Sequence, residues 1–235
     1  MGHLHNKEKV TMQEDRLYDN LLNLPLFLGM TRSELLEVAG HTKFDFKKAE
    51  AGLTIVQEGE PCHRLYFLLT GEMKVITEAD DHGYRIEEDI KAPEAFQLEC
   101  LFGFNQHFTH TYVTKSNCSL MSISKQEIQN LSNRYDIFRI NLLNIISTQT
   151  QKNNRRLFRV PPKDLSERIT RFFESHCLRP AGEKLIYIKM TRLAAEMNVK
   201  RIYVSNALNY MQDQKLINLF RGRIHIPALE KLINR

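Results

Sequence analysis

The chain has 235 residues, 42% of them hydrophobic, and a formal net charge of +5 at pH 7. This length suits one large domain or two smaller ones, and the apolar content is enough for ordinary cores. No apolar run is long enough to cross a bilayer, and residues 1–10 lack both the apolar block of a signal peptide and the myristoylation pattern. We therefore expect a cytoplasmic protein with no membrane attachment.

The cysteines lie far apart in the sequence, at Cys62, Cys100, Cys118 and Cys177. No C-x-x-C pair is present, so the sequence has no local signature of a zinc site or an iron–sulfur cluster. The spacing indicates reduced thiols, as in cytoplasmic proteins.

The charge is distributed unevenly along the chain. Residues 163–235 contain 14 Lys or Arg and 7 Asp or Glu, a net charge of +7, which leaves −2 for residues 1–162. A mildly acidic first part joined to a basic last part suggests that only the last part meets a polyanion such as nucleic acid. The alternative is a basic tail without a partner.

The first elements expected along the chain are helices. Residues 14–41 have helical spacing in two pieces, separated by Pro25 and Gly29. Thr31 followed by Glu34 predicts a capping box at the start of the second piece.

From residue 42 the apolar pattern becomes that of short strands. The segments are rich in β-branched and aromatic residues and are separated by Gly, Pro or Asp: TKFDFKK, LTIVQEG, RLYFLLTG, EMKVITEAD and YRIEEDIK. We expect at least two more strands within residues 110–124. The pattern is typical of a small all-β barrel or jelly roll.

A long helix is predicted over residues 134–157. Its apolar residues Phe138, Leu142 and Ile145 repeat four then three apart, which is the spacing of a coiled-coil seam, and we expect them to form the dimer contact. A second apolar face contains Ile140, Leu143 and Ile146. A helix that is apolar on two faces is buried on more than one side, here against the barrel and against a second copy of the chain. The alternative is a helix buried within one chain.

A proline hinge follows the long helix. Pro161 and Pro162 cannot continue it, and Asp164 is expected to cap the next helix together with Glu167. Residues 184–190 then have the composition of a strand.

Residues 192–198 and 200–213 have the pattern of two short helices with a tight break between them. Asn198 stands at the break, and Asn tolerates the left-handed backbone that such a turn requires. The segments on either side of Gly222 alternate and predict a β-hairpin with a basic tip. Two helices followed by a hairpin are typical of a winged helix-turn-helix.

The second of these helices has one core face and one outward face. Its core stripe is Val204, Ala207, Leu208 and Met211. Arg suits guanine O6 and N7 and Asn suits adenine N6 and N7, so we expect Arg201 and Asn206 to contact base edges in DNA. The full set of predicted DNA contacts is Lys200, Arg201, Ile202, Ser205, Asn206, Asn209, Arg221 and Arg223. The alternative is a solvated polar face.

The order of helix, barrel, long helix, hinge and winged helix resembles the Crp–Fnr superfamily of bacterial transcription regulators over nearly the whole chain. The segments that carry the resemblance are LLNLPLFLGMTRSELLEVA, IVQEGEPCHRLYFLLTGEMKVI and LAAEMNVKRIYVSNALNYMQDQKLI. The resemblance implies an α+β fold with a jelly-roll, cyclic-nucleotide-binding-like sensor domain at 1–133, a dimerisation helix at 134–159 and a winged helix-turn-helix at 160–235. It also implies a homodimer that reads a near-palindromic operator in double-stranded DNA and contacts RNA polymerase, and not an enzyme.

The recognition helix departs from the family pattern at three positions. Lys200 replaces the usual Ser, Ile202 replaces a common Glu, and Asn206 replaces a second Arg, whereas Arg201 matches. We therefore do not expect the operator sequence of the best-known members.

The effector pocket departs from the family as well. Members that bind cyclic nucleotides have a Gly-Glu pair and then an Arg that pairs with the cyclic phosphate, whereas this chain has Pro93 before Glu94 and has Thr109 near the expected Arg. A buried phosphate needs a paired cation, so we expect no binding of cyclic AMP. No cofactor is predicted and the effector is unknown. The pocket candidates are Glu94, Phe96, Glu99, Thr109 and His110.

Two other functions remain as alternatives. The first is a small-molecule or haem sensor of the same fold, because haem needs only one or two axial His or Cys ligands. The second is a metal-binding barrel enzyme that uses His107 and His110 with Glu94 or Glu99. Residues three apart on a strand point to opposite faces, and neither a G-x-S-x-G elbow nor a phosphate loop is present, so the enzyme is the less favoured of the two.

Overall fold

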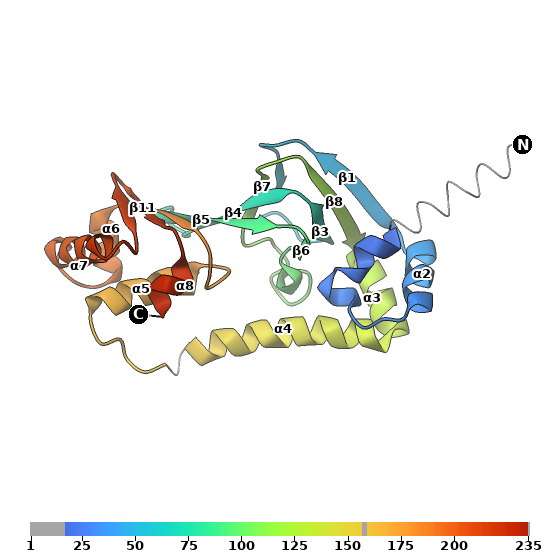
Figure 1. Cartoon of the computed structure of the whole chain (residues 1–235). Coiled ribbons are helices and arrows are strands. Elements are labelled where there is room, and N and C mark those ends of the chain that lie inside the picture. The colour runs from blue at the N-terminus through green and yellow to red at the C-terminus, as the bar shows by residue number, and fades with distance from the viewer. Residues whose placement is uncertain (1–16, 157–158, 235) are drawn as a thin grey trace, which may run out of the picture.

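The computed structural model describes residues 17–156 and 159–234. An N-terminal β-sheet domain is followed by a long helix and then by a C-terminal region of helices and short strands (Figure 1). This order confirms the α+β fold class expected from the sequence. The expectations for residues 1–10 and the last residue of the predicted helix 134–157 lie outside the described residues.

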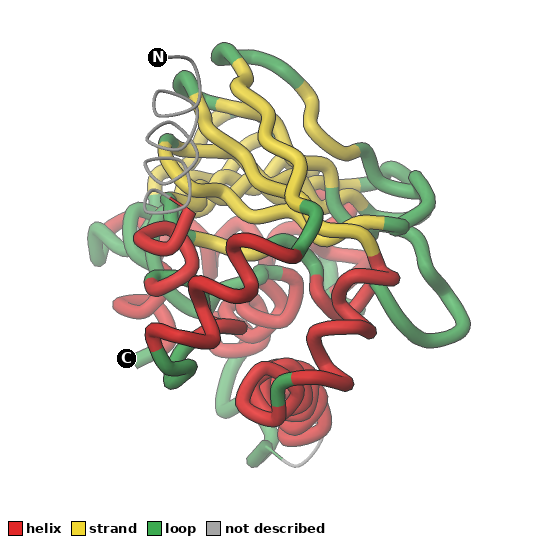
Figure 2. Tube along the Cα trace, turned by 90° about the vertical axis from the view of Figure 1, so that its right-hand side faces the viewer, coloured by secondary structure: helices red, strands yellow, loops and turns green. Residues whose placement is uncertain are grey.

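Two antiparallel sheets face each other in the N-terminal domain and enclose the first apolar core (Figure 2). One sheet has the order β1 (Phe44–Ala49), β8 (Cys118–Ser124), β3 (Arg64–Thr70) and β6 (Glu94–Ala95). The other includes β5 (Tyr84–Lys91), β4 (Glu72–Glu78), β7 (Thr111–Thr114) and β2 (Thr54–Val56) in that order. Each segment predicted as a strand from its β-branched and aromatic residues contains one.

Short helices close one end of this domain. They are a helical segment at residues 17–22, η1 (Pro25–Phe27), α2 (Arg32–His41), η2 (Leu98–Cys100) and α3 (Lys125–Arg134). The predicted capping box of α2 is confirmed, because the Glu34 N–H donates to Thr31 Oγ1 and the Thr31 N–H donates to Glu34 Oε2.

The long helix α4 (Asp136–Arg156) runs along the lower edge of the molecule in Figure 1. Phe138 is fully buried in the chain's own core, where its ring lies 5.2 Å from that of Phe27, and Leu142 is 7% exposed. Ile145 packs against the same core. Phe138 and Leu142 of the predicted dimer seam therefore cover the barrel of their own chain, whereas Ile145 is only partly buried against the same core.

The C-terminal region has an apolar core of its own. Its elements are α5 (Leu165–His176), β9 (Lys184–Ile188), α6 (Met190–Glu196), α7 (Arg201–Asp213), β10 (Asn218–Phe220), β11 (Arg223–Ile226) and α8 (Leu229–Ile233). The turn between α6 and α7 contains Asn198 with a φ of 47°, which confirms the left-handed backbone expected there. Asp164 caps α5 as predicted by accepting from the Glu167 N–H.

The two regions share one sheet, which the sequence did not indicate. Strand β9 of the C-terminal region pairs with β5 of the barrel, from Tyr84 opposite Ile188 to Glu88 opposite Lys184. The resulting seven-stranded sheet has the order β10-β11-β9-β5-β4-β7-β2. Ile86 of β5 belongs to the C-terminal core, so the barrel contributes a side chain to the other region's packing.

Candidate nucleic-acid interface and sensor barrel

The outward face of α7 is free of contacts with the apolar core. Val204, Leu208 and Met211 are fully buried, whereas Asn206 and Asn209 on the opposite side are exposed. The helical period of 3.6 residues separates these two sets. Of the remaining predicted contacts, Lys200, Arg201 and Ile202 are exposed and Ser205 is partly buried. Tyr203 and Tyr210 are also exposed on this helix, although no sequence pattern indicated them.

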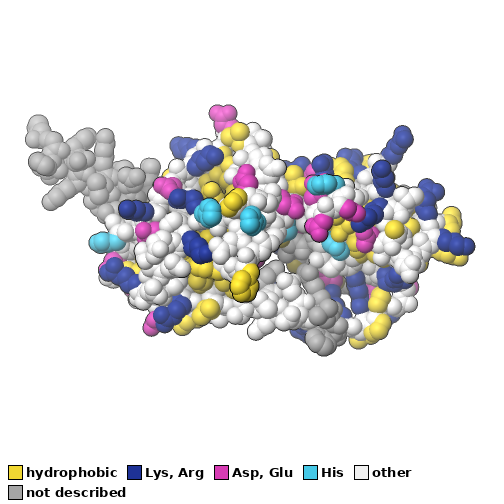
Figure 3. Space-filling model, turned by 180° about the vertical axis from the view of Figure 1, so that it is seen from behind, with side chains coloured by type: hydrophobic (Ala, Val, Ile, Leu, Met, Phe, Trp, Pro, Cys, Tyr) yellow, Lys and Arg dark blue, Asp and Glu magenta, His cyan; other side chains and the backbone are white. Residues whose placement is uncertain are grey.

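The start of α7 is electrically suited to an anion. Lys200 occupies the N-cap position without a side-chain hydrogen bond, and the first turn contains no acidic residue. The N–H groups of a helix N-terminus carry partial positive charge, to which Lys200 and Arg201 add. Lys and Arg side chains project from the surface of the C-terminal region, at the right of Figure 3.

The hairpin after α7 presents the two arginines predicted to contact DNA. Strands β10 and β11 are joined at Arg221 and Gly222, and Gly222 has a φ of 72°, which glycine adopts readily. Arg221 is exposed, and the Arg223 guanidinium lies 4.6 Å from the ring centre of Phe220. Gln212 accepts from the Leu219 N–H and so ties the end of α7 to the hairpin.

Aromatic rings occupy the barrel interior beside the predicted effector pocket. Phe96 stacks on Tyr112 with ring centres 4.4 Å apart, and Tyr66 contacts both Phe96 and Phe108. Phe96, Phe108 and Tyr112 are all nearly buried. This cluster packs the barrel interior with aromatic rings.

Gln97 organises the polar groups of this pocket, although no signal in the sequence identified it. The residue is buried and has a φ of 41°. Its Oε1 accepts from the Thr109 N–H at 2.8 Å and from Cys100 Sγ, and its Nε2 donates to the His110 carbonyl. These groups therefore satisfy one another without a ligand.

Among the described basic side chains, His110 is neutral, and Lys74 and Arg85 are paired with a carboxylate. Burial lowers the pKa of His110 to about 4, so its imidazole is neutral at pH 7, and its Nδ1 pairs with Thr77 Oγ1. Lys74 and Arg85 both form ion pairs with Glu87, at 2.8 and 3.2 Å. None of these three side chains therefore brings an unpaired positive charge to the predicted pocket.

The five predicted pocket residues differ in their surroundings. Glu94 forms an ion pair with Arg179 of the C-terminal region, and Glu99 and Thr109 are both exposed. Phe96, Thr109 and His110 do lie together around Gln97. The sequence did not indicate the partner of Glu94, because Arg179 comes from a segment far away in the chain.

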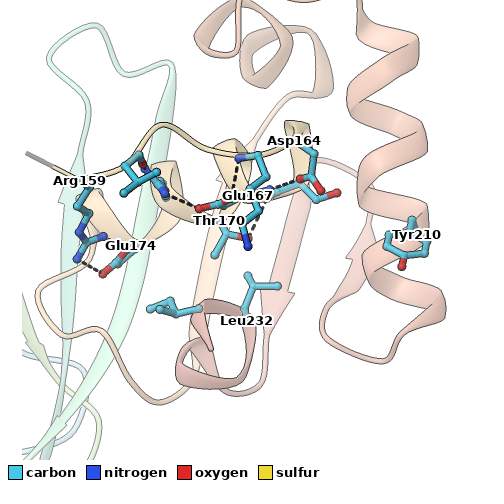
Figure 4. A pocket seen from close by; sticks show the side chains of 12 residues that line it. Arg159, Asp164, Glu167, Thr170, Glu174, Tyr210 and Leu232 are labelled. Atoms are coloured by element: carbon cyan, nitrogen blue, oxygen red, sulfur yellow. Dashed lines mark hydrogen bonds and ion pairs between the residues drawn. The ribbon is translucent and has the colours of Figure 1, made fainter. Parts of the chain in front are cut away.

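A cavity of about 540 Å³ lies at the hinge, between α5, α7 and α8 (Figure 4). Four of its charged side chains are paired: Arg159 donates two hydrogen bonds to the Glu174 carboxylate, and Arg171 pairs with Glu167. The Arg159–Glu174 pair and the contact of Arg171 with the Val160 carbonyl hold the hinge residues against α5. The lining contains equal numbers of basic and acidic side chains.

The junction between the regions is held by buried charges. Glu88 and Lys184 pair at 2.8 Å, with side chains 2% and 3% exposed. Glu88 also accepts from the Leu178 N–H at 2.7 Å, and Lys184 donates to the Ala181 carbonyl at 2.8 Å. The charges compensate each other in an environment that excludes water, so the pair fixes how the C-terminal region sits on β5.

One protein family and several solved structures are similar to this chain. The family "Cyclic nucleotide-binding domain" matches residues 46–135. The crystal structure of the Thermus thermophilus catabolite activator protein is similar over 89% of this chain and 96% of its own, with 18% identity and a TM-score of 0.51. The structure of a putative cyclic nucleotide binding protein from Ruegeria pomeroyi is similar over 94% of this chain and 96% of its own, with 13% identity and a TM-score of 0.44. The structure of the c-di-GMP-responsive regulator CLP of Xanthomonas campestris is similar over 78% of this chain and 94% of its own, with 18% identity and a TM-score of 0.45.

Residues 46–135 thus match the cyclic nucleotide-binding domain family, and the chain as a whole has the fold of the Thermus thermophilus catabolite activator protein. No curated protein matches the chain in sequence. Within residues 17–156 and 159–234, no helix combines the length and apolar character needed to cross a membrane.

Proposed function

We propose that this protein is a homodimeric, sequence-specific DNA-binding transcription regulator whose sensor barrel does not bind cyclic AMP. The observation that carries the proposal is the exposed face of α7, which presents Arg201, Asn206 and Asn209 beside a basic hairpin. In a winged helix-turn-helix this helix enters the major groove of DNA. The division into domains at 1–133, 134–159 and 160–235 is part of the proposal, as is RNA polymerase as a further partner.

The dimer is proposed to form along the face of α4 that points away from the barrel (Figure 2). Ile140 and Leu143 are 52% and 56% exposed in the single chain. They begin a series with alternating three- and four-residue spacing, which is the pattern of a coiled-coil seam. The seam consists of Ile140, Leu143, Ser147, Thr150 and Asn154. A two-fold dimer is also what a near-palindromic operator requires.

Replacing Arg201 by alanine is expected to weaken operator binding by about 1–3 kcal/mol and to relax specificity at one base pair, because a bidentate contact to guanine is lost. Fluorescence anisotropy with the selected operator and with each single-base variant of it measures both effects. Unchanged discrimination between operator and random DNA would show that Arg201 does not read a base.

The matched control is Arg223→Ala, in the hairpin. A phosphate contact carries no sequence information, so this variant should weaken binding to all sequences alike. The slope of the logarithm of the binding constant against the logarithm of the salt concentration should become shallower by about one. A selective loss of the operator in this variant would contradict the assignment of Arg223 to phosphate.

Titration calorimetry with cyclic AMP and cyclic GMP is expected to show no binding at physiological nucleotide concentrations. The pocket offers a neutral His110, and Phe96 and Tyr112 fill the adjacent space. Leaving a phosphate unpaired in such surroundings costs several kcal/mol. A dissociation constant in the low micromolar range for either nucleotide would overturn this part of the proposal.

A further inference from the structure

Ile202 is an exposed apolar residue on an otherwise polar face. It is the second residue of α7, and it is 59% exposed. It is not part of either apolar core. A β-branched residue is also a weak choice for an exposed helix position, where straight-chain polar residues are favoured. Neither packing nor helix propensity therefore accounts for Ile202.

The neighbours of Ile202 indicate what its side chain meets. Asn206 lies four residues further along α7, so the two side chains are adjacent on one face of the helix. Tyr203 is turned about 100° away around the helix axis, so it does not share this position. The face thus combines the amide of Asn206 with the apolar side chain of Ile202.

In the major groove of unmodified DNA, the C5-methyl group of thymine is the apolar feature of a base-pair edge. Asn206 suits adenine, whose pair also presents a thymine methyl group. We propose that Ile202 contacts the 5-methyl group of a thymine, within or next to the base pair that Asn206 reads. Ile202 is therefore a specificity-determining residue that selects an A·T pair in each half-site. This inference rests on the proposed function.

The experiment replaces thymine by deoxyuridine, which removes only the methyl group. An operator is first selected from random duplexes with the wild-type protein, and each thymine of the half-site is then replaced in turn. Replacing one particular thymine in the half-site is expected to weaken the binding of the protein to the operator about fourfold. Burying one methyl-sized group contributes about that factor to the affinity. The other thymines should show no such loss.

Variants of the same helix separate a methyl contact from a general effect. Ile202→Ala should bind the thymine and deoxyuridine operators equally, and Ile202→Val should keep the preference for thymine. Tyr203→Ala, at the neighbouring exposed position, should keep it as well. Circular dichroism should show unchanged helix content, because Ile202 packs in neither core.

The outcomes are distinguishable. If operator selection succeeds but no thymine is sensitive, or if Ile202→Ala still prefers thymine, the inference is wrong while the DNA-binding proposal stands. If the wild-type protein enriches no sequence, the proposed function fails and the inference fails with it.

Discussion

Replacing Glu88 by alanine is expected to destabilise the C-terminal region by about 3–5 kcal/mol and to detach it from the barrel. Lys184 would be left 3% exposed without its carboxylate, and the Leu178 N–H would lose its acceptor. A buried unpaired charge is far more costly than the loss of an exposed ion pair. The barrel should remain folded, because it has its own apolar core.

Two measurements test this expectation. Urea unfolding gives the change in the free energy of unfolding, and hydrogen exchange should show lost protection at the β5–β9 ladder while β3 and β8 stay protected. The matched control is Glu72→Ala, because Glu72 pairs with Lys91 on strands of the same sheet but is 40% exposed. That variant should change stability by less than about 1 kcal/mol. Equal effects from both variants would contradict the role given to Glu88.

A double replacement refines the test. Glu88→Met combined with Lys184→Met removes both charges, so it should recover part of the stability lost in Glu88→Ala. The recovery should be incomplete, because the Leu178 N–H stays without its carboxylate acceptor. Full recovery would mean that this N–H contributes little.

Replacing Leu143 by glutamate is expected to convert a micromolar dimer into a monomer. The two-fold axis places the two new carboxylates close together, and each chain loses the burial of a leucine, which contributes about 1.5–3 kcal/mol. Together these effects should raise the dissociation constant of the dimer at least about 100-fold. Sedimentation velocity over a range of concentrations measures the change. The fold should be retained, since Leu143 is 56% exposed in the single chain.

Two further variants separate this seam from the one predicted from the sequence. Gln149→Glu adds the same charge at an exposed position on another face of α4 and should leave the dimer intact. Phe138→Ala should lower the stability of the chain itself by about 3–5 kcal/mol, because its ring is buried in the barrel core. A Leu143→Glu protein that still dimerises with wild-type affinity would rule out the Ile140–Leu143 seam.

Local interactions explain why much of the fold was predictable. The alternation of residues 42–91 fixed the barrel strands, and the Thr31 capping box and the left-handed Asn198 depend only on residues a few positions away. The outward face of α7 was predictable for the same reason, since helical periodicity alone separates Asn206 from Leu208. The pocket was only partly predictable, because Gln97 acts through Thr109 and His110, whose hydrogen bonds depend on how the chain returns to this site.

The sequence by itself determined the elements, their order and the residues of the outward recognition face, because periodicity, caps and turns are encoded within a few residues. Only the tertiary structure decided which apolar stripe of α4 meets the barrel. Phe138 and Leu143 belong to two stripes whose apolar residues repeat with the same spacing, so the sequence pattern does not distinguish them. It also decided that β9 joins β5 and that Glu88 meets Lys184 across 96 positions of the sequence. Such contacts depend on the packing of whole elements, which no local pattern specifies.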